Sequence, residues 1–166
     1  MTEPTTEPAV VEPVVEPAVV EPVVVEITAE QTHPLRLAVL RFDTVTKEVV
    51  FPEDTWPGAF HLGVRVGDEL VATSSWVPRD HDGLPAVQLR GMATARNVQG
   101  SGLGGMLLQA GCARAAADGF KTVWARARDA ALPFYLRHGF HVEGEGFVDT
   151  ATQLPHHLVV RALRVR

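Results

Sequence analysis

A glycine-dense turn at residues 99–104, Gln-Gly-Ser-Gly-Leu-Gly, carries the clearest chemical signal in this sequence. It lies between a strand-like stretch and an amphipathic stretch, so it predicts a turn that opens a helix. The first N–H groups of such a helix have no intrahelical acceptor and lie at the positive end of its dipole. Glycines at Gly100, Gly102 and Gly104 leave this backbone accessible, because a Cβ would hold anionic oxygens away. The turn therefore predicts a pyrophosphate site.

Three kinds of phosphate-binding loop compete for this turn. A P-loop is excluded, because Gly105 and Met106 follow where a Lys-Ser or Lys-Thr pair would meet the terminal phosphate and its magnesium. Gly100, Gly102 and Gly105 match the dinucleotide pattern G-x-G-x-x-G, which is a weak signal alone. No buried apolar strand precedes it, and only about 60 residues follow, too few for further βαβ units. A nucleotide oxidoreductase is retained only because of this pattern.

The third kind is the coenzyme A turn of the GNAT superfamily of N-acetyltransferases, with the signature Q/R-x-x-G-x-G/A. Residues 99–104 fit it without a gap, and residues 134–140, Phe-Tyr-Leu-Arg-His-Gly-Phe, match a second family element downstream. The sequence resembles the family from about Trp56 to Leu163. The resemblance implies that acetyl-CoA is the acyl donor and that its acetyl group moves to a primary amine by direct attack in a ternary complex. A non-catalytic acyl-CoA-binding module is the alternative from another functional class.

The resemblance also implies where the cofactor binds. In the family, the strand before the turn parts from the next strand, and the gap admits the pantetheine arm. Unpaired N–H and C=O groups on a parted strand can bond to amides of the arm, and one N–H can stabilise the oxyanion by roughly 3–4 kcal/mol. The expected cofactor-binding residues are Met92, Ala93, Thr94, Gln99, Gly100, Ser101, Gly102, Leu103, Gly104, Gly105 and Phe134.

Tyr135 is the expected catalytic residue, because a tyrosine at this place in the family serves the departing thiolate. A phenol with a pKa near ~10 can donate a hydrogen bond or a proton to a thiolate whose conjugate pKa is near ~8.5. The other interpretation is that Phe134 and Tyr135 form an aromatic pair packed on the sheet. Where many relatives have an asparagine, this chain has Arg126, and Arg126 or Arg128 could meet a phosphate.

The general base and the acceptor are less clearly marked. Glu145, Asp149 and His156 follow the coenzyme motifs, where the last strands would border the acceptor groove, but spacing singles out none of them. The groove could be lined by Trp56, Trp76 and residues 79–83. The carboxylates of Asp80 and Asp82 in this last stretch would favour a cationic acceptor. A small amine, a peptide N-terminus and a lysine stay open as acceptors.

No metal is expected, because H-E-x-x-H is missing and His156 and His157 point to opposite faces of a strand. Cys112 is the only cysteine, so no internal disulfide exists and a reducing compartment is compatible. Its place among alanines in an expected helix indicates that Cys112 is a small residue packed in the core and not a nucleophile. The sequence shows no export signal or membrane span, and we expect a cytoplasmic protein.

Composition predicts one domain after a low-complexity tail. Residues 1–22 repeat Glu-Pro pairs every four or five residues and hold five Glu without Lys or Arg. They predict a disordered, polyproline-like tail, and residues 23–166 predict the N-acetyltransferase domain. The formal net charge of −5 lies in this tail, because residues 23–166 hold fifteen charges of each sign. Without a basic face, nucleic-acid binding is not expected. A homodimer is left open.

Hydrophobic periodicity predicts an α+β fold, and the resemblance implies a mixed, mostly antiparallel, twisted sheet flanked by helices, with a splayed strand pair for the cofactor. Strands are expected at residues 23–27, 60–66, 69–76, 86–92, 122–125, 140–145 and 157–163. A short helix capped by Thr32, with Pro34 in its first turn, should turn Leu35, Val39 and Leu40 inward. Further helices are expected at 103–117 and 131–137, and the first of these should bury a stripe of small residues made by Leu103, Leu107, Ala110, Arg114 and Ala117.

Overall fold

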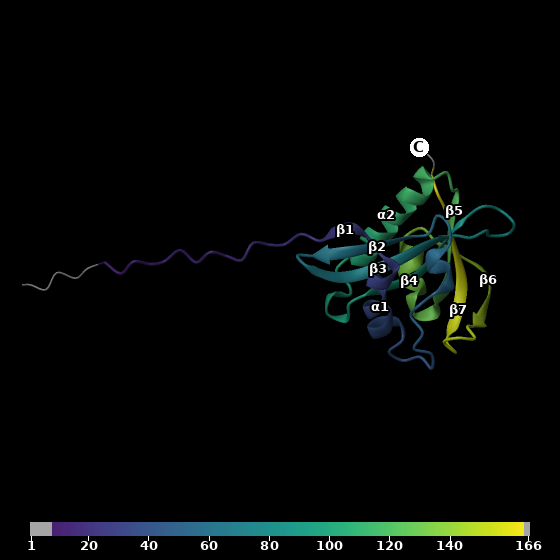
Figure 1. Cartoon of the computed structure of the whole chain (residues 1–166), viewed down its shortest axis with the longest axis horizontal. Coiled ribbons are helices and arrows are strands. Elements are labelled where there is room, and N and C mark those ends of the chain that lie inside the picture. The colour runs from purple at the N-terminus through teal and green to yellow at the C-terminus, as the bar shows by residue number, and fades with distance from the viewer. Residues whose placement is uncertain (1–7, 165–166) are drawn as a thin grey trace, which may run out of the picture.

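The computed structural model describes residues 8–164 of the chain. Residues 8–22 have no secondary structure and extend away from the rest of the molecule (Figure 1). The first element, β1 (Val23–Ile27), begins at the predicted boundary. Disorder of the tail stays a prediction, and residues 1–7 and 165–166 lie outside the described residues. No helix within residues 8–164 is long and apolar enough to cross a membrane.

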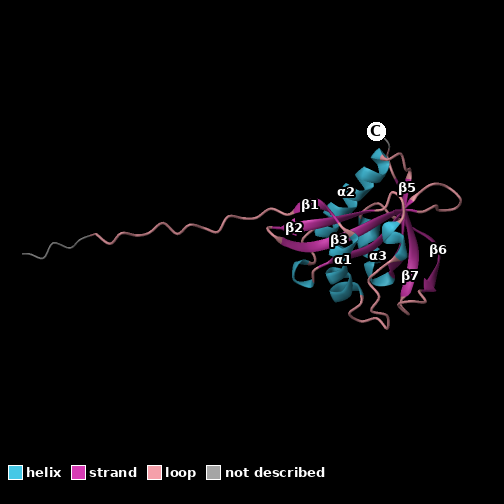
Figure 2. Ribbon diagram, in the orientation of Figure 1, coloured by secondary structure: helices cyan, strands magenta, loops and turns pink. Residues whose placement is uncertain are grey.

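Seven strands form one sheet in the order β1-β2-β3-β4-β5-β7-β6 (Figure 2). The strands after β1 are β2 (Phe60–Val66), β3 (Glu69–Pro78), β4 (Val87–Thr94), β5 (Thr122–Arg128), β6 (His141–Val148) and β7 (Pro155–Ala162). Every neighbouring pair is antiparallel except β4 and β5, which are parallel. The predicted hairpin of β2 and β3 is confirmed, and so is the expected mixed, mostly antiparallel sheet.

β4 and β5 stay together over only part of their length. Their pairing runs from Val87 with Val123 to Leu89 with Ala125 and then stops. Beyond that point β4 pairs only with β3, and β5 pairs only with β7. The facing edges of the two strands therefore carry backbone N–H and C=O groups that no neighbouring strand satisfies. This is the splayed strand pair that the sequence led us to expect.

A β-bulge at Gly91 bends β4 where it parts from β5. The pairing with β3 shifts between Thr73 and Ser75, and Gly91 has a φ of +58°, which a residue with a side chain rarely adopts. A Cβ at Gly91 would also lie 2.9 Å from Nε of Arg36. Glycine is thus required both by the backbone and by the close approach of a buried arginine. No role for this glycine was predicted from the sequence.

Arg36 is fully buried and is the centre of a polar network under β4. Its guanidinium binds both carboxylate oxygens of Asp54 at 2.7 and 2.8 Å and donates to the hydroxyl of Ser75 at 2.7 Å. Nδ1 of His61 lies 2.7 Å from the same hydroxyl, and the Phe51 ring lies 4.0 Å from the guanidinium carbon. A paired, hydrogen-bonded charge can be buried, and this pair ties the first helical segment to the bulge.

The first helical segment differs from the prediction. α1 (Ala29–Leu35) is capped by Thr28, which forms a capping box with Gln31, so Thr32 is a buried helical residue and Pro34 lies inside the helix. A proline there removes a backbone donor and crowds the preceding turn. The chain continues as a π-helix, η1 (Arg36–Leu40), which buries Arg36 rather than Leu35, Val39 and Leu40. Those three side chains are half-buried.

α2 (Leu103–Ala117) has its predicted bounds but buries a different face. The buried residues are Leu103, Leu107, Leu108, Gly111, Cys112 and Ala115, so the predicted stripe through Ala110, Arg114 and Ala117 was wrong after its first turn. Trp76 determines this face, because a Cβ on Gly111 would lie 1.9 Å from the Trp76 ring. Trp76 and Ser75 alternate along β3 and point to opposite faces. α2 and the Arg36 network therefore cover opposite faces of the sheet.

Candidate active site

A cavity of about 600 Å³ lies at the N-terminus of α2. Its walls come from the end of β4, the glycine turn and α3 (Leu132–Arg137). Ten of the eleven expected cofactor residues line it, together with Val39, Ala131, Tyr135, Arg137 and His138. The exception is Ser101, whose hydroxyl donates to the carbonyl of Val98 and so points into the turn.

Backbone N–H groups at this helix start are free to bind a ligand. Gly102 is the N-cap in a left-handed conformation, with a φ of +86°, and no side chain caps the helix. The N–H groups of Leu103, Gly104 and Gly105 therefore lack intrahelical acceptors. Gln99 stabilises the turn from outside, because its amide donates to the carbonyl of Thr94 at 3.0 Å. This arrangement gives an anion several converging donors at the positive end of a helix.

Small residues in the first turn of α2 allow α3 to approach it closely. A Cβ on Gly104 would lie 3.0 Å from the Phe134 ring, and one on Gly105 would lie 2.8 Å from Nε2 of His138. The Phe134 and His138 rings lie 4.6 Å apart, and Nδ1 of His138 lies 2.8 Å from the carbonyl oxygen of Phe134. Arg137 and His138 were not among the site residues predicted from the sequence. Their spacing of three and four residues from Phe134 places them on the same helix face and could have indicated them.

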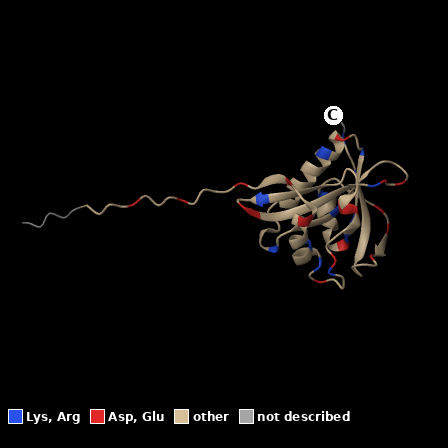
Figure 3. Ribbon diagram, viewed as in Figure 1, with Lys and Arg blue, Asp and Glu red and all other residues tan. Residues whose placement is uncertain are grey.

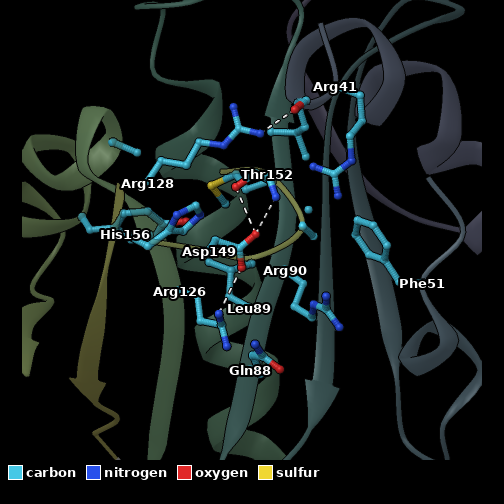
Figure 4. A pocket seen from close by; sticks show the side chains of 17 residues that line it. Arg41, Phe51, Gln88, Leu89, Arg90, Arg126, Arg128, Asp149, Thr152 and His156 are labelled. Atoms are coloured by element: carbon cyan, nitrogen blue, oxygen red, sulfur yellow. Dashed lines mark hydrogen bonds and ion pairs between the residues drawn. The ribbon is translucent and has the colours of Figure 1, made fainter. Parts of the chain in front are cut away.

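A second cavity, of about 220 Å³, also has Tyr135 in its lining, and Figure 4 shows it from close by. It is lined by β4, β5, the end of η1 and residues around Asp149 and His156. Both cavities share three lining residues, Met92, Ala131 and Tyr135. The two cavities therefore adjoin at these residues, close to where β4 and β5 part.

Tyr135 is buried at this junction, with 8% of its surface exposed. Its ring packs edge-on against Phe134 and Phe140, at centroid distances of 5.3 and 5.2 Å. Its hydroxyl makes no hydrogen bond to any residue among 8–164. Burial raises the pKa of Tyr135 to about 12, so the phenol stays protonated throughout the neutral range. The packing interpretation and the proton-donor interpretation are compatible, because the ring packs while the hydroxyl keeps an unused donor.

The three candidate bases have different environments. Glu145 is exposed on β6 and lines neither cavity, whereas Asp149 and His156 line the smaller one. Burial alone would raise the pKa of Asp149. Hydrogen bonds from the N–H and hydroxyl of Thr152, with nearby His156 and Arg126, outweigh burial and lower this pKa. Asp149 is therefore a weak base.

His156 is better arranged to accept a proton. It is 6% exposed, and its Nδ1 lies 2.8 Å from the carbonyl oxygen of Leu154. A carbonyl only accepts hydrogen bonds, so Nδ1 carries the hydrogen and the neutral ring has its lone pair on Nε2.

Other residues considered from the sequence lie away from both cavities. Trp76 is a core residue, and Trp56 lies under Arg79 outside the cavity walls. Residues 79–83 line neither cavity, so the expected cation-binding groove is not formed there. Cys112 is buried, as expected for a core residue, and burial raises its pKa.

The sequence predicted no metal site, and it left Arg126 and Arg128 on β5 as possible phosphate ligands. Among residues 8–164, His81, Asp82 and Glu143 bring ligand atoms within 4.8 Å of one another. His81 and Glu143 already pair directly at 2.9 Å, outside both cavities. Arg126 and Arg128 line the smaller cavity rather than the one at the glycine turn.

Comparison with known proteins places this architecture in a family. The model of the acetyltransferase (GNAT) family matches residues 29–140. An uncharacterised N-acetyltransferase of Bacillus subtilis (strain 168), YitI, is 31% identical over 124 residues, which cover 73% of this chain and 83% of YitI.

Two solved structures share the fold at low sequence identity. One is FeeM, an N-acyl amino acid synthase from uncultured soil microbes, with a TM-score of 0.72 and 13% identity over 87% of this chain and 92% of that one. The other is an aminoglycoside 6'-N-acetyltransferase complexed with coenzyme A, with a TM-score of 0.69 and 15% identity over 87% and 98% of the two chains. Because the family match spans more than half of its residues, this chain belongs to the acetyltransferase (GNAT) family and is an acyltransferase.

Proposed function

We propose that this enzyme transfers an acetyl group from acetyl-CoA to a primary amine by direct attack in a ternary complex. The observation that carries this proposal is the junction of two cavities at Tyr135, Met92 and Ala131. A donor in the larger cavity and an amine in the smaller one would meet there without an acyl-enzyme step. Cys112, the only cysteine, is buried and lines neither cavity, which also favours direct transfer.

The larger cavity has the features that coenzyme A requires. Its diphosphate would accept hydrogen bonds from the free N–H groups at the start of α2, and Gly100 and Gly102 leave that backbone uncovered. The pantetheine amides would pair with the open edge of β4 at Met92, Ala93 and Thr94, as an added strand does. Gln99 and Ser101 would shape the turn through the hydrogen bonds of their side chains. Phe134 would pack beside the arm.

The chemistry requires one bond to form and one to break. The amine nitrogen attacks the thioester carbonyl carbon, and the carbonyl oxygen gains negative charge that a β4 N–H can stabilise. The C–S bond then breaks and the sulfur leaves as a thiolate beside Tyr135. In solution a phenol, with a pKa of ~10, is a weaker acid than a thiol, with a pKa of ~8.5, so complete proton transfer from Tyr135 to the thiolate is uphill. Tyr135 therefore acts by donating a hydrogen bond to the sulfur as charge develops.

We propose His156 as the general base. Its Nε2 carries the lone pair and the ring lines the acceptor cavity, so it can take the ammonium proton directly or through a water. Asp149 would instead hold Arg126 and the loop at Thr152, because its oxygens already accept hydrogen bonds from both. This assignment chooses among three candidates that the sequence could not rank.

Thiol release with a panel of amines tests the proposal. Acetyl-CoA should raise the melting temperature and NADH should not, and thiol release should require an added amine. Tyr135→Phe should lower the turnover number by about a hundredfold and leave the Kd of coenzyme A unchanged, because the aromatic packing is kept. Thiol release that never depends on an amine would favour a non-catalytic binding module. Unchanged turnover in Tyr135→Phe would restrict Tyr135 to packing.

We also propose that residues 1–22 form a disordered tail on a domain of residues 23–166, and that the enzyme acts in the cytoplasm. The lack of secondary structure at residues 8–22 supports the first statement, and a single free cysteine suits a reducing compartment. Deleting residues 1–22 should leave the melting temperature and turnover unchanged. A loss of either would show that the tail belongs to the folded domain.

A further inference from the structure

Four arginines line the smaller cavity. Arg41 follows η1, Arg90 lies on β4, and Arg126 and Arg128 lie on β5, so three separate segments bring guanidinium groups to one place (Figure 4). Asp149 is the only carboxylate in the lining. Across the molecule, blue and red ribbon segments are mixed (Figure 3), so this concentration of one sign is a local feature.

Three of these arginines have carboxylate partners. Arg90 pairs with Glu53 at 2.5 Å, and Arg126 pairs with Asp149 at 3.0 Å. Arg128 lies 3.7 Å from Asp43, and its other terminal nitrogen donates to the carbonyl of Leu40.

Arg41 differs from the other three. It has no carboxylate partner among residues 8–164, and only its Nε is used, donating to the carbonyl of Glu48 at 2.8 Å. Its guanidinium carbon lies 5.5 Å from the Phe51 ring centroid. Its two terminal nitrogens are therefore held in place with their donors unused.

The positive charge of the half-buried Arg41 is only partly compensated by its neighbours. Burial and the Arg128 guanidinium lower the pKa of Arg41, and the Asp149 carboxylate opposes them only in part. A positive group that loses water without gaining a counterion destabilises its surroundings until an anion binds. The planar guanidinium suits a carboxylate in particular, because two parallel N–H groups can bind both oxygens.

We propose that the acceptor is a small primary amine that carries a carboxylate, such as an amino acid, with its carboxylate bound by Arg41. This inference rests on the proposed acetyl transfer. A cavity of about 220 Å³ is smaller than the range typical of drug-sized ligands, which favours a small molecule. The same cavity reaches Tyr135, so a short acceptor can place its anion on Arg41 and its amine at the thioester. A polycationic acceptor would be repelled by these arginines.

The test compares matched pairs of substrates on the full-length enzyme. Thiol release is measured with the common α-amino acids, each beside its own α-carboxamide, and with phosphoethanolamine and spermidine. Each amino acid should have a kcat/KM about tenfold to hundredfold higher than that of its amide. The difference should lie mainly in KM, because the neutral amide cannot form the charge-assisted hydrogen bonds that a carboxylate forms with Arg41. Three results would each overturn the proposal. The enzyme could prefer phosphoethanolamine to every amino acid, it could use the amides as well as the acids, or it could prefer spermidine.

Two variants locate the anion. Arg41→Gln should reduce the preference for acid over amide by about tenfold, mainly through a higher KM for the acid. Arg65→Gln is the matched control, because Arg65 lies on the β2–β3 hairpin and lines neither cavity. An acid preference that survives in Arg41→Gln would refute the role of Arg41. Because the acid and amide comparison uses the wild-type enzyme, a variant that fails to fold does not prevent the test.

A binding experiment separates this inference from the proposed function. Calorimetry with coenzyme A present should show that N-acetylglycine binds at least tenfold more tightly than N-acetylglycinamide. Transfer to amines without acid preference would overturn the inference and keep the proposed function. No transfer to any amine, with the acid still preferred in binding, would overturn the proposed function and keep the anion site.

Discussion

Replacing Gly102 with alanine tests the anion site at the start of α2, and Gly119 provides a control at the other end of the same helix. Gly102 and Gly119 have φ values of +86° and +93°, and a Cβ at either position would meet no atom within 4 Å. The left-handed conformation should therefore destabilise both variants by about 1–2 kcal/mol. The two glycines differ in that Gly102 lines the larger cavity and Gly119 does not.

The binding of coenzyme A should separate the two variants. A methyl group at Gly102 would hold the diphosphate away from the free N–H groups, and a hydrogen bond to a charged group contributes about 1.5–3 kcal/mol. Losing one such bond raises the Kd by roughly tenfold to hundredfold. Calorimetry measures the Kd, and urea unfolding measures the stability of each variant. Equal Kd values for Gly102→Ala and Gly119→Ala would refute the reasoning.

Three further predictions concern buried groups. Tyr135 is the only tyrosine, so tyrosinate absorbance in an alkaline titration should show a midpoint of about 12 in the folded enzyme and about 10 in urea, and equal midpoints would contradict its burial. Gly111→Ala should destabilise the fold by about 1–3 kcal/mol in urea unfolding, although alanine favours helices, because its Cβ would lie 1.9 Å from Trp76. Arg36→Met should destabilise the fold by about 3–5 kcal/mol, since the buried Asp54 carboxylate would lose its positively charged partner. Burial alone would raise the pKa of Asp54, but the hydrogen bonds and charge of Arg36 lower it below the ordinary value of 3.8. The free energy of unfolding of the wild-type protein should therefore fall as the pH drops below 3.8, and that of Arg36→Met should fall less over the same range.

Features that depend on near neighbours in the sequence were predicted well. The bounds of α2, the turn before it and the β2–β3 hairpin follow from glycines and from local periodicity, which act over a few residues. Ten of the eleven expected cofactor residues line one cavity, and all of these except Phe134 lie in the stretch from the end of β4 to the start of α2. Their roles stay a prediction.

Features that depend on distant contacts were predicted poorly. The buried face of α2 was wrong because Trp76 on β3 determines it, and no local pattern records that contact. The start of α1 was one turn too late, since Thr28 and Thr32 both suit a cap and only the capping box with Gln31 distinguishes them. The Arg36 network was missed because an arginine in a sequence is normally assigned to the surface.

The sequence by itself determined the family resemblance, the glycine turn that we propose binds an anion, and Tyr135 as the residue of interest, because each is carried by a short continuous motif. Only the tertiary structure decided what lies around Tyr135. Two cavities adjoin there, where β4 and β5 part after Leu89 and Ala125, and the proposed acceptor side is lined by arginines from three separate segments. Side chains far apart in a chain become neighbours only through packing, so the lining of this cavity is a property of the fold.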